Sequence, residues 1–190
     1  MKEYASHKSI LNSGRFAAVV FLAACSGGGS SGGEQAERAC APITGGASEF
    51  TTTCTGCSVS TAGSAVDRDL STSADVTSDA LSTSYTTTVR ATAQSGVVFP
   101  GGSNPGVFLT SESACGYCNV TLSTYLDGTL QETKSGTNNT TLSGYSAERA
   151  VILNTTLPFD AVEVGDSGAV TPNNAGRELR VFELCSDVQL

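Results

Sequence analysis

Two Cys-x-x-Cys pairs are the residues in this sequence whose type and spacing could carry chemistry. They are formed by Cys54 with Cys57 and by Cys115 with Cys118. Four thiolates from two such pairs can hold zinc or iron in a tetrahedral site. In an exported chain, however, thiols usually oxidise to disulfides before they meet a metal. Disulfides are therefore the favoured interpretation, ahead of a metal site and of redox activity.

The second pair also raises the question of redox chemistry. The tetrapeptide CGYC at residues 115–118 is similar to the active-site motif of bacterial disulfide isomerases. In that motif the N-terminus of a helix lowers the pKa of the first thiol. Here residues 119–126 alternate as a β-strand does, and the rest of a thioredoxin-like α/β pattern is missing. A redox protein is therefore the weakest of the functions that we consider.

The first 24 residues predict a removable export signal. Basic Lys2, Lys8 and Arg15 precede an apolar run at residues 16–24, which is far shorter than the roughly 20 residues of a membrane-spanning helix. The segment LAAC that ends at Cys25 resembles the lipobox of bacterial lipoprotein precursors. This resemblance implies cleavage before Cys25, a diacylglyceryl thioether on its sulfur, and a further acyl chain, such as palmitate, on its new amino group.

The residues after the signal predict a tether and a location. Residues 25–39 hold the lipidated cysteine and a run, SGGGSSGGE, whose composition is that of a flexible coil without core-forming capacity. Ser26 is not the aspartate that typically retains such proteins at the inner membrane. The resemblance therefore implies a lipid anchor in the bacterial cell envelope, at the outer membrane. Residues 40–190 remain for a single folded domain.

The composition of the mature chain argues against several kinds of function. Loss of residues 1–24 removes His7, the only histidine, and with it histidine bases, Ser-His-Asp triads and His-containing zinc sites. It leaves a formal charge of −10, because three of 10 basic and one of 18 acidic residues are lost. Such a charge argues against nucleic acid as a partner. We interpret Asp160, Glu163 and Asp166 as solvated surface charges rather than a glycosidase pair, and we expect no enzyme.

Six cysteines remain once Cys25 is acylated, and an even number predicts three disulfides. They are Cys40, Cys54, Cys57, Cys115, Cys118 and Cys185. Cys185 closes the last predicted strand, and the first and last strands of a sandwich often lie side by side. We therefore expect Cys185 to pair with Cys40, Cys54 or Cys57. The cysteines of residues 115–118 pair either with each other or with the other Cys-x-x-Cys.

Alternation, β-branched residues and turn chemistry predict an all-β domain. The clearest turn is Asp127-Gly128, which is typical of a type I′ hairpin. The predicted strands cover residues 84–92, 96–99, 106–110, 119–126, 129–133, 149–155, 160–164 and 179–185. About eight short strands separated by such turns favour a disulfide-stapled β-sandwich or jelly roll.

Three short segments resemble a known family. AVDRDLSTSA at residues 65–74, LPFDAVEV at 157–164 and ELRVFEL at 178–184 together resemble galactose-binding-like, discoidin-type jelly rolls. The sequence departs from that pattern at Arg68, where the family usually has glycine, and at Ala74, where an aromatic residue is common. The resemblance implies the fold, while members of this fold include lectins, enzyme appendages and adhesion modules.

The same resemblance implies a structural Ca²⁺ ion between the opening loop and the final strand. The matching residues are Asp67, Asp69, Thr72 and Glu183. Carboxylate, hydroxyl and main-chain oxygens are the ligands that calcium prefers. Against the site stands Arg68, whose charge lies beside the expected ion. The alternative is that Asp67 pairs with Arg68 or caps a turn.

These observations predict a lipid-anchored envelope protein whose β-sandwich is a non-catalytic binding or adhesion module. Its inter-strand loops would recognise a glycan or a protein at the envelope. The alternative from a different class is a structural component, in which lipidated copies self-associate or join a larger envelope complex. An enzyme or a metal or redox protein that uses the Cys-x-x-Cys pairs is the third alternative.

Overall fold

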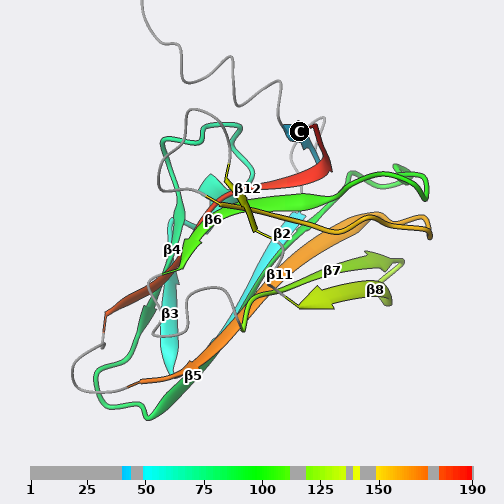
Figure 1. Cartoon of the computed structure of the whole chain (residues 1–190). Coiled ribbons are helices and arrows are strands. Elements are labelled where there is room, and N and C mark those ends of the chain that lie inside the picture. Colours follow the sequence, from blue (N-terminus) through cyan, green and yellow to red (C-terminus); the bar gives the residue numbers. More distant parts are fainter. Residues whose placement is uncertain are drawn as a thin grey trace, which may run out of the picture.

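The computed structural model describes residues 40–43, 49–111, 119–135, 139–141, 149–170 and 176–189, which form two facing β-sheets (Figure 1). The prediction of an all-β sandwich is therefore confirmed. Within the described ranges the helical structure is one 3₁₀ turn, η1 (Ala62–Ala65). None of the described helices has the length and hydropathy needed to cross a membrane.

One sheet has seven strands and the other has five, and every strand pair is antiparallel. The seven-stranded sheet runs in the order β3 (Cys57–Ser60), β4 (Ala74–Ser78), β12 (Arg177–Val188), β6 (Gly106–Ser111), β10 (Arg149–Ile152) and β9 (Asn139–Thr141), with β1 (Cys40–Pro42) paired to β12. The five-stranded sheet runs in the order β2 (Glu49–Thr55), β5 (Ser84–Thr92), β11 (Ala161–Ala169), β7 (Thr121–Leu126) and β8 (Thr129–Ser135).

Seven of the eight predicted segments contain a strand, and the prediction for residues 96–99 is wrong. Only Phe99 forms an isolated bridge there, to Phe159, while Val97 and Val98 project into solvent. Five further strands, β1 to β4 and β9, were not predicted. Strand β2 shows the reason: its sequence EFTTTCT lies at a sheet edge and carries threonines where a buried strand would alternate with apolar residues.

The predicted Asp-Gly hairpin is confirmed between β7 and β8. Asp127 and Gly128 both have positive φ values, 49° and 75°, and they connect the paired residues Leu126 and Thr129. Two consecutive positive φ values define the type I′ turn, whose twist matches that of the strands it joins. The turn places one tip of the five-stranded sheet beside Asp160, whose carboxylate accepts a hydrogen bond from the Asp127 N–H at 2.9 Å.

Buried aliphatic side chains from both sheets fill the space between them. Members of this core include Val76, Leu109 and Leu184 from the seven-stranded sheet and Val89, Leu122 and Val164 from the five-stranded sheet. A second, smaller cluster lies on the other face of the seven-stranded sheet. There Leu70, from the loop between η1 and β4, packs with Phe108 and Phe182. The loop that contains the predicted calcium ligands is thus held against the sheet by apolar packing.

Two charged side chains close the sandwich along strand β8, which is an edge strand. The Lys134 ammonium donates to the carbonyl of Ile152 at 2.8 Å. The Glu132 carboxylate accepts from the N–H of Thr156 at 2.9 Å, from its hydroxyl at 2.8 Å, and from the N–H of Leu157 at 3.3 Å. The two side chains reach from the edge strand to the last residue of β10 and to the segment that follows it, so the two sheets are connected there.

A disulfide between Cys40 and Cys185 joins the two ends of the domain. Its Cα atoms lie 5.3 Å apart, and β1 pairs with the last strand, β12, around it. The expectation that Cys185 pairs with an N-terminal cysteine is confirmed, and Cys40 is the partner among the three that were considered. Both cysteines are buried within the cluster that contains Phe108 and Phe182.

We predict that the double substitution Cys40→Ser, Cys185→Ser lowers the free energy of unfolding by about 4–5 kcal/mol, because the bridge closes a very long loop in the unfolded chain. Its sequence separation is 145 residues. Urea unfolding measures the loss. The matched control is Cys54→Ser, Cys57→Ser, whose bridge spans only three residues and is worth about 2 kcal/mol by the same reasoning. Equal losses in the two variants would contradict the loop-closure account.

Candidate functional site

The loop that was predicted to bind calcium is organised by the carboxylate of Asp67. One oxygen accepts from the N–H of Asp69 at 2.9 Å, and the other accepts from the Thr72 hydroxyl at 2.7 Å. The N–H of Thr72 donates to the carbonyl of Asp69 at 3.1 Å, which closes the turn. Arg68, which lies between Asp67 and Asp69, has a φ of 65°. Arginine thus adopts the left-handed conformation for which glycine is favoured, at a cost of about 1–2 kcal/mol.

Glu183 meets this loop from the final strand. A register shift in β12 between Val181 and Glu183 marks a bulge, a feature that re-aims side chains. The Glu183 carboxylate accepts from the N–H of Arg68 at 2.9 Å through Oε2. Its other oxygen, Oε1, is buried and has no hydrogen-bond partner, and the residue is only 2% exposed. A buried carboxylate oxygen without a partner is costly unless a cation or a proton satisfies it.

The surroundings of Glu183 change its acidity. Burial is the main cause that raises the pKa of its carboxyl group to about 8, and the negative charge of Asp67 adds to the effect. The N–H and the positive charge of Arg68 act in the opposite direction without offsetting it. At neutral pH the ion-free protein therefore keeps a proton on Glu183, at a place where a bound cation would remove it.

Asp69 differs from the other predicted ligands in where it points. Its carboxylate accepts from the N–H of Ser71 at 2.8 Å and from the Ser71 hydroxyl at 2.6 Å. These two hydrogen bonds lower the pKa of Asp69, which is exposed. The structure therefore gathers Asp67, Thr72 and Glu183 around one loop and turns Asp69 toward Ser71. In the described parts of the chain, no three His, Cys, Asp or Glu side chains converge as a metal-binding group.

The Glu183 oxygen without a hydrogen-bond partner bears on whether Asp67, Thr72 and Glu183 suit calcium. Calcium takes six to eight oxygens, of which main-chain carbonyls and water can supply several. Asp67, Thr72 and Glu183 provide two carboxylates and a hydroxyl, and the buried Oε1 lacks any other partner. The donor types of these three residues are those that calcium prefers. Asp69 would join them only after its side chain leaves Ser71.

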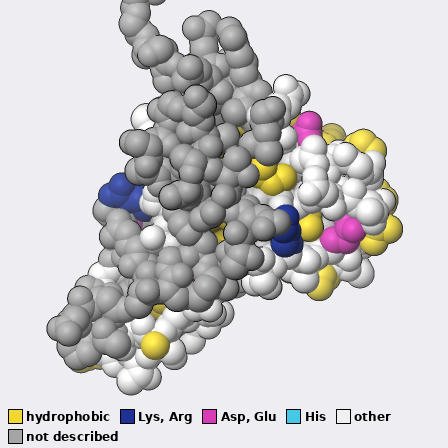
Figure 2. All heavy atoms as spheres, in the orientation of Figure 1, with side chains coloured by type: hydrophobic (Ala, Val, Ile, Leu, Met, Phe, Trp, Pro, Cys, Tyr) yellow, Lys and Arg dark blue, Asp and Glu magenta, His cyan; other side chains and the backbone are white. Residues whose placement is uncertain are grey.

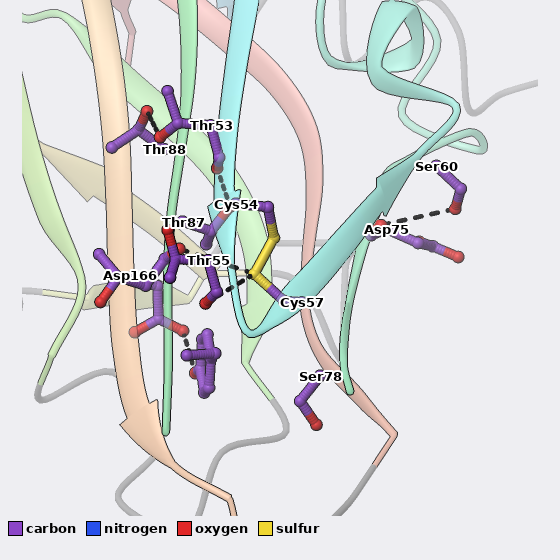
Figure 3. Close-up of a disulfide and its surroundings, with 12 residues drawn as sticks. Thr53, Cys54, Thr55, Cys57, Ser60, Asp75, Ser78, Thr87, Thr88 and Asp166 are labelled. Carbon is purple, nitrogen blue, oxygen red and sulfur yellow. Dashed lines mark hydrogen bonds between the residues drawn. A yellow bond between two sulfur atoms is a disulfide. The ribbon is translucent and has the colours of Figure 1, made fainter. Parts of the chain in front are cut away.

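The first Cys-x-x-Cys pair is a disulfide at the turn between β2 and β3. Cys54 and Cys57 are bonded across Gly56, whose φ of 70° allows the tight reversal (Figure 3). The close-up shows the bridge lying beside the threonines of β2 and β5. In this state the two sulfurs are not metal ligands. Because Cys54 and Cys57 bond to each other, the alternative in which Cys115 and Cys118 pair with them is wrong. Cys25, Cys115 and Cys118 lie outside the described residues, so acylation of Cys25 and a bridge between Cys115 and Cys118 stay predictions.

A second cluster of polar side chains lies on the outer face of the five-stranded sheet. Arg90 on β5 and Glu163 on β11 are cross-strand partners, joined by 2.9 Å contacts from Nε and from Nη2 to Oε2. Tyr125, on the neighbouring strand β7, donates its hydroxyl to Oε1 of Glu163 at 2.8 Å. The Arg90 guanidinium lies over the Tyr125 ring, 3.6 Å from its centroid. All three side chains are partly exposed.

This trio is a preorganised polar group. Burial raises the pKa of Tyr125, and the hydrogen bond to Glu163 raises it further, so the phenol stays protonated as a donor. Threonine hydroxyls cover the same face beside it, and Thr53 and Thr88 are hydrogen-bonded across β2 and β5 at 2.8 Å. The face therefore presents fixed donors and acceptors to solvent.

The trio was not predicted, although part of its signal is in the sequence. Alternation in residues 84–92 and 160–164 assigns Arg90 and Glu163 to polar faces, but the pairing of strands 73 residues apart is not readable from one sequence. The interpretation of Asp166 as a surface charge is wrong. It lies three positions after Glu163, faces the interior, and accepts the buried Tyr85 hydroxyl at 2.7 Å.

No protein-family model and no curated protein matches the chain. Four chains of solved structures are similar to it. One of them is the family 32 carbohydrate-binding module of C. perfringens NanJ in complex with galactose. The match covers 71% of this chain and 90% of that chain, with 12% sequence identity and a TM-score of 0.40. The assignment of a β-sandwich depends on the strand pairing of this chain and not on that match. The galactose-binding-like relationship stays a prediction.

We predict that Glu183→Gln raises the melting temperature in chelator near pH 8 and leaves it unchanged near pH 5. The folded protein holds a proton on Glu183 that the unfolded chain has lost above about pH 4.5. The stability of the wild-type protein therefore falls as pH rises from about 4.5 toward about 8, and glutamine removes this fall. Thermal unfolding followed by circular dichroism measures the effect.

Glu132→Gln is the matched control, because its pKa shift has the opposite sign. Burial acts to raise the pKa of Glu132, but hydrogen bonds from Thr156 and Leu157 outweigh it and lower the pKa. This variant should be no more stable than the wild-type protein at either pH. If Glu183→Gln were destabilising at both pH values, burial would not raise the pKa of the Glu183 carboxyl group as described.

Proposed function

We propose that the mature protein is a lipid-anchored, extracytoplasmic binding module whose β-sandwich recognises a glycan without catalysing a reaction. The observation that carries this proposal is the trio of Arg90, Glu163 and Tyr125 on the outer face of the five-stranded sheet. Its donors and acceptors are held in place by each other rather than by a mobile loop. A ligand that meets them therefore loses little free energy to side-chain ordering.

A sugar fits the chemistry of this face better than a charged ligand does. Neighbouring hydroxyls of a sugar both donate and accept hydrogen bonds, so they can meet a guanidinium and a carboxylate at the same time. Arg90 and Glu163 offset each other's charge, which disfavours strongly anionic or cationic partners. The hydroxyls of Thr53 and Thr88 extend the polar surface along the sheet.

The test is retention of the purified domain on immobilised peptidoglycan and lipopolysaccharide. We expect binding by the wild-type protein and at least about tenfold weaker binding by Arg90→Ala and by Glu163→Gln, because each breaks the trio. Ser58→Ala is the matched control, since Ser58 is an exposed polar residue on β3 of the opposite sheet. Equal retention of all four proteins would place glycan recognition elsewhere. Absence of retention would favour a protein partner, which a pull-down from the envelope identifies.

The anchor is the part of the proposal that comes from the first 39 residues. We propose that Cys25 carries the lipid, that residues 25–39 connect it to the domain, and that the protein resides at the outer membrane. What supports this is the LAAC segment at the end of a short apolar run, followed by Ser26. Cys25→Ser should remove the acyl mass and release the protein from the membrane fraction. An acylated Cys25→Ser protein would rule this anchor out.

Calcium belongs to the proposal as a structural ion. Asp67, Thr72 and Glu183 would hold it, and when bound it would supply positive charge to the partnerless oxygen of Glu183. Because the ion would tie the opening loop to β12, it would stabilise the fold rather than take part in a reaction. Added calcium should therefore abolish the pH dependence predicted above for the ion-free protein. A melting temperature that is the same in calcium and in chelator would remove the ion from the proposal.

A further inference from the structure

Large apolar side chains are exposed at one end of the sandwich, on two loops and at the start of β8. Val98 is 53% exposed, and Val97, Leu130 and Leu157 are 42–52% exposed. They come from the loop after β5, the β7–β8 hairpin and the loop before β11. Figure 2 shows hydrophobic side chains gathered at this end, on the right of the view, interspersed with acidic ones. Exposed apolar side chains clustered in this way mark interaction surfaces.

These side chains stand on loops that are firmly held. Phe99 and Phe159 pair through two backbone hydrogen bonds of 2.7 and 3.0 Å, and their rings lie 5.2 Å apart. Asp160 accepts from the N–H of Asp127 in the hairpin turn. Glu132 fixes the segment that contains Leu157. The apolar residues are therefore presented by a rigid frame, so that burying them costs little conformational entropy.

The chain enters the domain at the same end. Cys40 is paired with Val188, whose N–H donates to the carbonyl of Asn104 at 2.8 Å. The side-chain oxygen of Asn104 accepts from the Asn154 amide at 2.7 Å. Residues 104 and 154 belong to the two loops that carry Val98 and Leu157. The apolar side chains and the entry point at Cys40 are thus linked through a short series of direct contacts.

The length of the preceding segment decides which end of the domain faces the anchor. The composition of residues 25–39 predicts a coil with an end-to-end distance of about 20 Å. The nine-residue strand β5 alone extends for about 30 Å. An anchor at Cys25 therefore keeps the end near Cys40 within about 20 Å of the bilayer, whereas the opposite end is about a strand length farther along the sandwich.

We propose that this end of the sandwich rests on the lipid bilayer, with Val97, Val98, Leu130 and Leu157 in its interfacial region. The inference rests on the proposed lipid anchor. It adds that the domain has a fixed orientation on the membrane instead of moving freely on its tether. The five-stranded sheet would then stand roughly perpendicular to the membrane plane, and ligands would reach its outer face from the side.

Charge determines which lipids suit this surface. Asp127, Glu132 and Asp160 lie at this end, and residues 93–105, 126–132 and 153–160 contain no lysine or arginine. The attraction is therefore apolar, and anionic headgroups oppose it. Vesicles of phosphatidylcholine should bind this end better than vesicles in which phosphatidylglycerol replaces part of the phosphatidylcholine.

Single tryptophan reporters test the orientation, because the chain contains no native tryptophan. Val98→Trp places a reporter at the proposed contact. Leu81→Trp is the matched control, since Leu81 is fully exposed and precedes β5 at the opposite end of the sandwich. Each lipidated full-length mature protein is reconstituted into phosphatidylcholine vesicles with and without brominated acyl chains. We expect a blue-shifted emission and several-fold stronger quenching for Val98→Trp only.

The outcomes separate this inference from the proposed anchor. Intact mass on the same samples reports whether Cys25 is acylated, and an unacylated mass overturns both. With acylation present, equal quenching of the two reporters overturns the membrane orientation and leaves the anchor intact. A blue shift of the Val98→Trp reporter that grows with protein concentration before vesicles are added also overturns it, in favour of a second copy of the chain on this surface.

Discussion

Strand β12 pairs with β1, β4 and β6, and the main features of this protein are positioned through it. It contributes Glu183 to the loop of Asp67, Cys185 to the bridge that joins the two ends of the domain, and Val188 to the contact with Asn104. A shift of its register by one residue would turn the side chains of Glu183 and Cys185 to the opposite face of the sheet and would break the backbone contact of Val188. The bridge to Cys40 opposes such a shift, because it fixes one residue of β12 to β1.

Two glutamates of the same fold show how surroundings decide what a carboxylate can do. Glu163 lies on a solvent-facing sheet and has Arg90 and Tyr125 as partners, so its charge is satisfied while its side chain stays accessible. Glu183 is buried and satisfies only one of its two oxygens. The first arrangement suits recognition of a polar ligand, and the second suits a proton or a structural ion.

Local patterns predicted the strands well where one face is buried and turns are unambiguous. Strand β5 matches its predicted bounds because residues 84–92 alternate without interruption between core and solvent. Strand β2 was missed because an edge strand can carry threonine on both faces. The strand predicted at residues 96–99 was wrong because valines that contact solvent have the same β-propensity as valines of a core.

The candidate sites were predictable only where their residues are close in sequence or belong to a family pattern. Asp67 and Thr72 share one turn, and the resemblance supplied Glu183 as their distant neighbour. No such pattern exists for Arg90 and Glu163, whose meeting depends on the order of strands in the sheet. Asp69 is close in sequence to the other predicted ligands, but its carboxylate accepts two hydrogen bonds from nearby Ser71 instead.

The inward-facing charges of strand β8 affect how copies of the protein would associate at high local concentration. Molecules tethered to one membrane share a thin layer, where their sheet edges meet far more often than in free solution. An edge strand with unpaired backbone groups can add a neighbour's strand and start a continuous sheet. Lys134 and Glu132 point inward from β8 to Ile152 and Thr156, and inward-pointing charges on an edge strand oppose the addition of another strand. Such charges disfavour edge-to-edge association along β8 where many copies are held close together.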